Sequence, residues 1–388
     1  MLRVIILVIL EAEFLDLGLA VRACLPTHLR AFVTSYMDMP NNNPPACTID
    51  AIEQKYAIAS QCSPANYSFY LGASNENIGE ILKLDPKTNC GVKLFMGSST
   101  GNMLVDNEQA LESIFRSAST LIATHCEDET SIREALARAK EKYGENIPIA
   151  EHPHIRTREA CIKSTAKAIE MALKSGAQLH ILHTSTADEV EMVLEARKKN
   201  PNISFEVCVH YLWFCDEDYP KYGTHIKCNP AIKRRSDMEA LRSAVAQGLP
   251  GAVATDHAPH LLTEKDGSYT HAPSGLPTIQ HSLRMMLQLS KQGIFPIGMV
   301  PQMMSHAPAE TFRIAERGYI REGYFADLVL VEESKSRNAT PAYKCGWTPI
   351  REEELDFGVA HTFVNGIQVV KDYKLTGANA GRRLTFDR

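Results

Sequence analysis

The stretch TREACIKSTAKAIEMALKSGAQLHILHTSTADE (residues 157–189) contains a helix, a strand and the start of a second helix, and this alternation decides the fold. Its first part carries one apolar stripe at helical spacing, formed by Ile162, Ala166, Ile169 and Leu173. Gly176 follows as a helix-ending residue, and QLHILHT (178–184) is an apolar run typical of a buried strand. Thr186 with Glu189 predicts a capping box that opens the next helix.

The same alternation extends over most of the chain. Continuous apolar runs, as expected for parallel strands covered on both faces, occur at 33–39, 66–72, 91–96, 120–126, 178–184, 204–210 and 251–257. Seven such units favour an α/β fold with a TIM-type (β/α)8 barrel, because eight strands close the barrel. The first strand is then missing or atypical and should precede Val33. A doubly wound sheet is the alternative. Ser236 with Glu239 predicts another capping box.

Changes in the pattern of predicted strands and helices divide the chain into three parts. Residues 33–316 form the predicted barrel, and 317–388 contain strand-like runs that predict a small appended β domain. Residues 1–32 are an atypical N-terminal segment. Its opening MLRVIILVIL is shorter than the roughly 20 apolar residues of a membrane span and is followed by Glu11. We therefore favour a buried strand or a non-native leader over a signal peptide.

Composition narrows the class of protein. The chain has 388 residues, 44% of them hydrophobic and 22% charged, which is ordinary for a folded domain and excludes extensive disorder. The net charge of −5 comes without any basic run, which argues against a nucleic-acid partner. Ten cysteines without a CxxC pair are typical of reduced thiols in the cytoplasm. We expect a small-molecule substrate and no membrane.

Polar residues cluster at the ends of the predicted strands. Lys93 lies in the third run, His125, His183 and His210 end the next three, and Asp256 ends the seventh. Each alone is more often a hydrogen-bonded structural residue than a ligand. In a barrel, however, strand ends meet at the active-site face, and imidazole and carboxylate groups suit zinc. The series therefore favours a metal site.

The segment ATDHAPHLLTEK (254–265) is the most specific local signal, because it places Asp256 at a strand end and His260 in the following loop. With it, the chain from about Val33 to the C-terminus resembles dihydroorotase, a family of the amidohydrolase superfamily. The other motifs, in the family's order, are VTSYMDMPNNNPP (33–45), GVKLFMGSSTGN (91–102), ATHCE (123–127), LHILHTS (179–185), EVCVHYLWF (206–214), IKCNPAIK (226–233) and GYFADLVLV (323–331).

The resemblance implies a role for each matching residue. Lys93 matches a lysine that is carboxylated and bridges two zinc ions, and His125 and His183 match ligands of the second zinc. Asp256 matches the aspartate that binds the first zinc and moves the proton. The positions that hold the substrate are Asn41, Asn229 and His260. The implied reaction is reversible closure of N-carbamoyl-L-aspartate to dihydroorotate, in pyrimidine biosynthesis. A neutral amine is needed for carboxylation, so Lys93 should be buried.

One part of the family pattern is absent. The family has an HxH pair and an arginine after its first barrel strand, but His28 is the only histidine ahead of Val33. Its usual leader, which contributes strands to the β domain, is missing as well. Residues 1–32 are expected to be foreign, through a frameshift, a wrong start or a chimeric join, or else to supply a first strand without ligands. The first zinc site is then incomplete, because zinc normally has three or four protein ligands.

These departures leave three functions open. The first is a dihydroorotase of impaired activity, for which assembly into a homo-oligomer stays open. The second is another cyclic amidohydrolase, of the allantoinase or hydantoinase type. The third is a non-catalytic dihydroorotase-like subunit with a protein partner such as aspartate transcarbamoylase. PHIRTREA (153–160) does not replace the absent HxH pair and arginine, because it has the wrong position in the chain and stands at a predicted helix start.

Overall fold

The protein is described from a computed structural model. The structure describes residues 4–6, 9–12, 33–97, 103–333 and 345–388. His28, most of the N-terminal segment and the end of the 91–102 motif lie outside the described residues.

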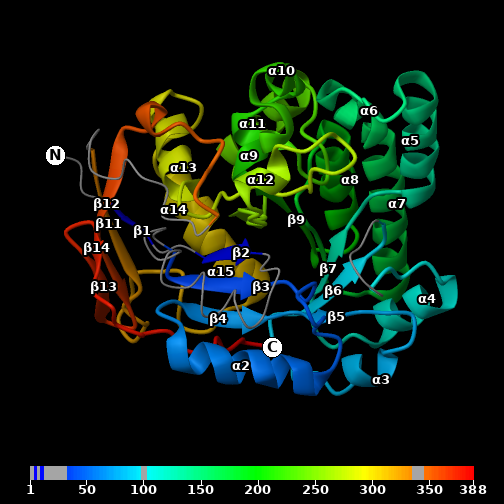
Figure 1. Ribbon diagram of the computed structural model, residues 1–388. Coiled ribbons are helices and arrows are strands. Elements are labelled where there is room, and N and C mark those ends of the chain that lie inside the picture. The colour runs from blue at the N-terminus through cyan, green and yellow to red at the C-terminus, as the bar shows by residue number, and fades with distance from the viewer. Residues whose placement is uncertain (1–3, 7–8, 13–32, 98–102, 334–344) are drawn as a thin grey trace.

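A parallel barrel with eight strand positions forms the body of the described chain (Figure 1). One sheet has the order β2-β3-β4 and the other β10-β9-β8-β7-β6-β5, and the run 66–72 connects them. β10 lies against β2, which closes the circle. The strands are β2 (Ile9–Ala12), β3 (Ser35–Asp38), β4 (Asn66–Phe69), β5 (Leu71–Gly72), β6 (Val92–Phe95), β7 (Ile122–His125), β8 (Leu179–Ile181), β9 (Ile203–Cys208) and β10 (Ala252–Ala254). The predicted barrel is confirmed, with β2 as the strand before Val33.

Helices cover the barrel, among them the one predicted from periodicity over residues 157–175. The main ones are α2 (Ile49–Cys62), α4 (Glu108–Ser117), α5 (Glu129–Tyr143), α7 (Arg158–Ser175), α8 (Ala187–Arg197), α11 (Arg235–Ala246), α13 (Ser282–Lys291) and α15 (Ala307–Phe312). Gly176 ends α7 with a left-handed φ of 74°, and the capping box of Thr186 and Glu189 opens α8, both as predicted.

The second predicted capping box is wrong. α11 begins at Arg235, so Ser236 lies inside its first turn, and Arg234 stands at the cap without a side-chain hydrogen bond. A tertiary contact accompanies this start: the carboxylate of Asp237 accepts hydrogen bonds from Arg158 Nε at 2.9 Å and from the Ala187 N–H at 3.0 Å. Sequence spacing does not reveal that contact.

A small antiparallel sheet stands beside the barrel (Figure 1). Its order is β1 (Val4–Ile6), β11 (Leu328–Glu333), β12 (Phe357–Val364), β13 (Ile367–Lys371) and β14 (Lys374–Leu375). The expectation that the leader gives this sheet no strand is wrong, because Val4 pairs with Val331 and Ile6 with Val329. The run VII (4–6) has the β-branched composition that favours such a pairing.

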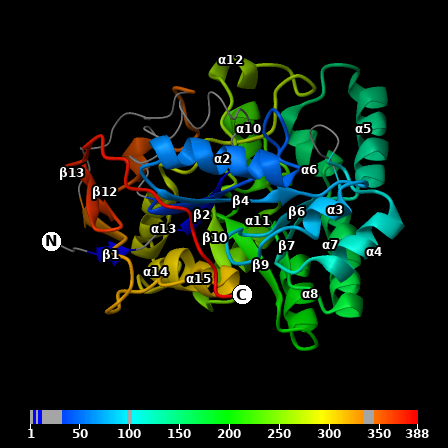
Figure 2. The same ribbon diagram turned by 90° about the horizontal axis from the view of Figure 1, so that it is seen from below.

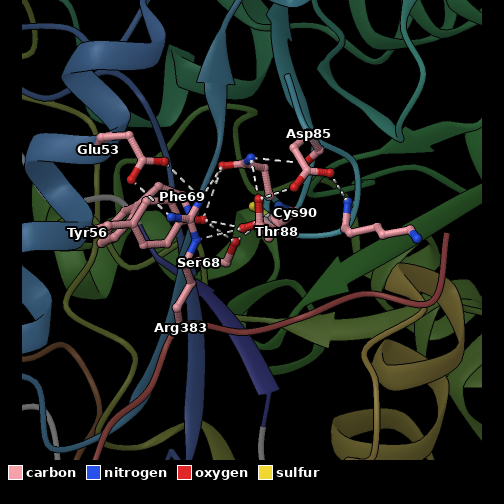
Figure 3. Close-up of polar contacts among 10 residues, drawn as sticks. Glu53, Tyr56, Ser68, Phe69, Asp85, Thr88, Cys90 and Arg383 are labelled. Atoms are coloured by element: carbon pink, nitrogen blue, oxygen red, sulfur yellow. Dashed lines mark hydrogen bonds and ion pairs between the residues drawn. The ribbon is translucent and has the colours of Figure 1, made fainter. Parts of the chain in front are cut away.

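The C-terminal segment returns to the barrel instead of ending in the small sheet. The Leu384 N–H donates to Tyr67 O at 2.9 Å, and the Ala315 N–H donates to Thr385 O at 2.9 Å. Figure 2 shows this segment crossing from β13 to α15. In Figure 3 the guanidinium of Arg383 lies over the ring of Tyr56 and donates hydrogen bonds to the Glu53 carboxylate. The segment thus holds α2, β4 and α15 together.

Candidate metal and substrate site

The predicted ligands lie at one edge of the parallel sheet. Lys93 is within β6, His125 is the last residue of β7, His183 follows β8 by two residues and Asp256 follows β10 by two residues. β6, β7 and β8 are neighbours, and Lys93 pairs in register with Ala123. Lys93 is 1% exposed, as the sequence predicts, and its ammonium lies 4.5 Å from the Phe95 ring centre.

Two of these ligands face each other directly. His125 Nδ1 and His183 Nε2 are 3.0 Å apart and share a hydrogen bond. Two nitrogens bound tetrahedrally to one zinc at about 2.0–2.1 Å would be about 3.3 Å apart. The pair is therefore within a few tenths of an ångström of the spacing needed to hold one metal ion. The residues fit the metal that the family resemblance implies.

A carboxylate behind His125 orients its ring. His125 Nε2 donates to Glu127 Oε2 at 3.0 Å, and the Arg156 guanidinium donates to the same oxygen. Burial by itself would raise the pKa of Glu127, but Arg156 and His125 outweigh it and lower the pKa to about 2. The ionised carboxylate keeps the proton of His125 on Nε2, which leaves the lone pair of Nδ1 available to bind a metal.

The second histidine has a constrained backbone. His183 has a φ of 36°, an unusual value for a residue other than glycine, and its N–H donates to Glu206 Oε1 at 3.2 Å. Asp256 has a φ of 45°. Positive φ values at two predicted ligands fit the tendency of strained backbone to gather at functional sites. Burial, His125 and Lys93 lower the pKa of His183, which favours the neutral ring that binds metals.

The predicted substrate residues come from three loops. Asn41 is half-buried after β3, and half-buried Asn229 has a side-chain oxygen without a hydrogen-bond partner among the described residues. His260 Nε2 is 3.1 Å from Ser274 O, so the ring donates a hydrogen bond there. No hydrogen bond joins these three described side chains to one another.

A buried ion pair holds the loop that carries Asn41. The Lys55 ammonium reaches Asp38 Oδ2 and Asn42 Oδ1 at 2.5 Å each and Met39 O at 3.0 Å. Lys55 is fully buried and Asp38 is 1% exposed. Breaking a buried pair by removing one partner typically costs about 3–5 kcal/mol. The loop after β3 is therefore rigidly anchored.

Two buried lysines hold the loop that follows Asp256. Lys265 Nζ donates to the carbonyls of Lys227 at 3.1 Å, Pro273 at 2.7 Å and Gly275 at 3.0 Å. Lys227 Nζ donates to the carbonyls of Tyr269 and Ala272, both at 2.6 Å. These hydrogen bonds fix the Gly- and Pro-rich loop of residues 265–275, which we call the braced loop and which lies over this edge of the barrel.

Sequence reasoning missed several supporting residues. Glu127 stands in the quoted motif ATHCE, and a carboxylate two residues beyond a strand-end histidine was the available signal. Arg156 belongs to PHIRTREA, where its pairing with Glu127 could not be read from spacing. His210, by contrast, was among the strand-end residues that the sequence singled out; it is fully buried, and neither ring nitrogen has a hydrogen-bond partner among the described residues.

The first strand position is present without the family's ligands. β2 reads ILEA and pairs in parallel with β3, Ala12 opposite Asp38. Among the described residues, three metal-binding groups lie within 4.8 Å of one another only at Cys215, Asp216 and Glu217. These residues are consecutive, and Glu217 pairs with Arg235 at 2.6 Å, so we assign no function to them.

Comparison with known proteins places this barrel in a family. The amidohydrolase family model matches residues 18–369, which begins ahead of Val33, where the motifs start. The chain belongs to the amidohydrolase family. It is 31% identical to a dihydroorotase of Pyrococcus abyssi over 356 residues, 91% of this chain and 78% of that protein. It is 28% identical to an allantoinase of Desulfitobacterium hafniense, over 90% of this chain and 80% of that protein.

Solved structures agree on the fold. An L-hydantoinase from Arthrobacter aurescens has a TM-score of 0.92 at 22% identity, covering 99% of this chain and 89% of its own. The inactive dihydroorotase-like domain of a Chaetomium thermophilum CAD-like multifunctional protein has a TM-score of 0.69 at 14% identity, covering 98% and 99%. No helix in the described part of the chain is long and apolar enough to cross a membrane.

Proposed function

We propose that the chain is a cyclic amide hydrolase of the dihydroorotase type, which interconverts dihydroorotate and N-carbamoyl-L-aspartate. The observation that carries the proposal is the His125 and His183 pair, whose facing nitrogens are 3.0 Å apart at the strand-end edge that also bears Lys93. Similarity to curated dihydroorotases favours this substrate over allantoin or hydantoin.

We assign the metal to His125, His183, Lys93 and Asp256, with Lys93 carboxylated. A bound zinc supplies Lewis acidity and a water of lowered pKa. Lys93, in β6, is buried, and burial favours the neutral amine that carboxylation requires. The family's two-zinc site is incomplete on the β2 side, so we expect one firmly held ion and one weak site.

The chain's own residues then bind the substrate and move a proton. Asp256 accepts the proton of the attacking water and delivers it to the ring nitrogen that leaves. Asn41, Asn229 and His260 donate hydrogen bonds to the substrate carboxylate. The braced loop after Asp256 excludes bulk water. We place the reaction in the cytoplasm.

A second candidate is a non-catalytic dihydroorotase-like subunit that binds a partner such as aspartate transcarbamoylase or a second copy of the chain. The sequence of β2 favours it, because ILEA offers no imidazole where the family has two. Such a subunit needs no metal, whereas the enzyme does.

Metal analysis and substrate assays distinguish these functions. The purified full chain is loaded with zinc, desalted, analysed for metal, and assayed with dihydroorotate, allantoin and hydantoin at equal concentrations. At least one zinc per chain with turnover of dihydroorotate supports the proposal. Preferred turnover of allantoin or hydantoin contradicts the substrate assignment, and a folded chain without zinc or turnover supports the non-catalytic subunit.

A further inference from the structure

A cavity of about 250 Å³ lies outside the metal site, between α5, the short helix α6 (His152–Ile155) and the braced loop. Figure 1 shows α5 and α6 close together at the upper right of the molecule. Arg156 and Lys227 contribute cations to its wall, with Lys140 at the exposed rim. Ile132, Leu136 and Ile155 supply an apolar wall. No Asp or Glu is among the described residues that line it.

The cations are held in place rather than spread over the surface. The Arg156 side chain is 11% exposed and Lys227 is 8% exposed. The Lys227 ammonium has three N–H donors and two acceptors among the described residues, the carbonyls of Tyr269 and Ala272. Burial and the nearby Arg156 lower the pKa of Lys227 to about 8. An anion beside both groups would offset the repulsion between Lys227 and Arg156, whose guanidinium also pairs with Glu127.

We propose that this cavity binds a small carboxylate with an apolar body, at a site distinct from the metal-binding edge. The carboxylate accepts hydrogen bonds from Arg156 and Lys227, and the apolar body packs on Ile132 and Ile155. Arg156 also donates a hydrogen bond to Glu127. Glu127 contacts Nε2 of His125, whereas His183 contacts Nδ1 on the other side of the ring. The occupant therefore lies behind the predicted ligand and not on its metal-binding face.

Calorimetry with three probes tests the chemistry of the site. The zinc-loaded full chain is titrated at pH 7 with benzoate, with the neutral isostere benzamide and with inorganic phosphate. Benzoate is expected to bind at least tenfold more tightly than benzamide, because only benzoate pairs with the cations, and more tightly than phosphate, which lacks the apolar body. Equal binding of benzamide overturns the ionic assignment, and tighter binding of phosphate overturns the apolar one.

Variants test the location. Arg156→Met should weaken benzoate binding about tenfold to a hundredfold, the contribution of a hydrogen bond to a charged group. Arg133→Met is the control, since Arg133 lies on α5, which borders the cavity, and its side chain is 70% exposed, so the change should have no effect on binding. If Arg156→Met does not fold, Lys140→Glu at the rim should weaken binding at least threefold with an unchanged Tm.

Two further results would overturn the proposal. One is the absence of heat up to about 10 mM benzoate, ten times the Kd of a millimolar site. The other is displacement of benzoate by saturating dihydroorotate, which would place benzoate in the proposed catalytic site. Because binding is measured without turnover, an inactive enzyme would contradict the proposed function and leave this test intact.

Discussion

At the scale of single residues, Glu127 sets the state of His125. A carboxylate only accepts hydrogen bonds, so its contact with Nε2 fixes the ring proton there and aims the Nδ1 lone pair at His183. Arg156 compensates the buried charge. A histidine two residues before a buried glutamate is thus more informative than the histidine alone.

We predict that Glu127→Gln weakens zinc binding about tenfold to a hundredfold, the usual cost of losing a group that orients a metal-bound histidine. The amide loses the charge that pairs with Arg156 and no longer favours one tautomer of His125. A competition titration with a chromophoric chelator measures the zinc affinity. Glu129→Gln is the control, since Glu129 lies at the start of α5 with a 27% exposed side chain. Equal zinc affinity in the wild type and Glu127→Gln would contradict this role.

For Asp256 we predict a catalytic and not a structural loss. Asp256→Asn should lower turnover of dihydroorotate about 10²–10⁴-fold, as expected when a general acid–base group is removed. The far-UV circular dichroism and Tm should stay near those of the wild type. Asp266→Asn is the control, because its carboxylate is 58% exposed and pairs with His225. Wild-type turnover in Asp256→Asn would reject the assignment.

At the scale of elements, the braced loop depends on a lysine that is costly to bury. Burial lowers the pKa of Lys265 to about 7, whereas an unfolded lysine titrates near 10.4. Below pH 7 both states carry the charge, and the folded state bears the full cost of burying it. Between about pH 7 and pH 10 the unfolded state binds more protons, so the contribution of Lys265 to stability rises with pH.

We therefore predict a pH-dependent effect of Lys265→Met. The difference in unfolding free energy, wild type minus variant, should grow between pH 7 and pH 9 by up to about 1.4 kcal/mol per pH unit. Urea unfolding at pH 6, 7, 8 and 9 measures it. Lys199→Met, at an exposed lysine, removes the same charge without burial and should give a nearly constant difference. A difference that stays constant from pH 6 to pH 9 would show that the buried amine stays charged on its three carbonyls.

The C-terminal segment is a second element whose attachment can be measured. Arg383 pairs with both carboxylate oxygens of Glu53 at 3.0 Å, and its guanidinium lies 3.5 Å from the Tyr56 ring centre (Figure 3). An exposed ion pair contributes up to about 1 kcal/mol and an exposed cation–π contact about 0.5–1 kcal/mol. We expect Arg383→Met to destabilise the fold by about 1–2 kcal/mol in urea unfolding. Glu53→Gln, which keeps the ring contact, should cost less, and the reverse order would contradict this account.

The sequence predicts elements better than the contacts between them. The residue types near each position were enough to predict the end of α7 at Gly176 and the capping box at Thr186. It failed at Ser236, where the contact between Arg158 and Asp237 accompanies an earlier helix start. The facing of His125 and His183 follows from strand order, and the resemblance named both. The support from Glu127 and Arg156 comes from residues 29 positions apart, which no local pattern connects.

At the scale of the whole molecule, the N-terminal segment joins the two sheets. β1 pairs with β11 in the small sheet, and β2 pairs with β3 in the barrel. The chain therefore has the backbone of a first barrel strand but not the side chains that the family carries there. β2 completes the barrel, and its sequence ILEA contains no histidine.

Restoring those side chains is the sharpest test of the N-terminus. We predict that replacing residues 1–32 with a family leader, which carries HxH and an arginine after the strand, raises zinc towards two ions per chain. Strand register supports the design: Ala12 lies opposite Asp38, so β2 ends at the edge where the loop of Asn41 begins. Metal analysis after desalting measures the zinc, and a leader with both histidines changed to alanine is the control.

Activity should follow the metal, for two reasons. The histidines complete a zinc site that otherwise has only Asp256 and the carboxylated Lys93, fewer than the three or four protein ligands that zinc normally has. The arginine adds a cation for the substrate carboxylate, which neutral Asn41 and Asn229 do not provide. Turnover of dihydroorotate should therefore rise by orders of magnitude in the graft and little in the alanine control. If the ungrafted chain already holds two zinc ions and turns over at a comparable rate, β2 needs no ligands, and the metal must be held by residues other than those assigned to it.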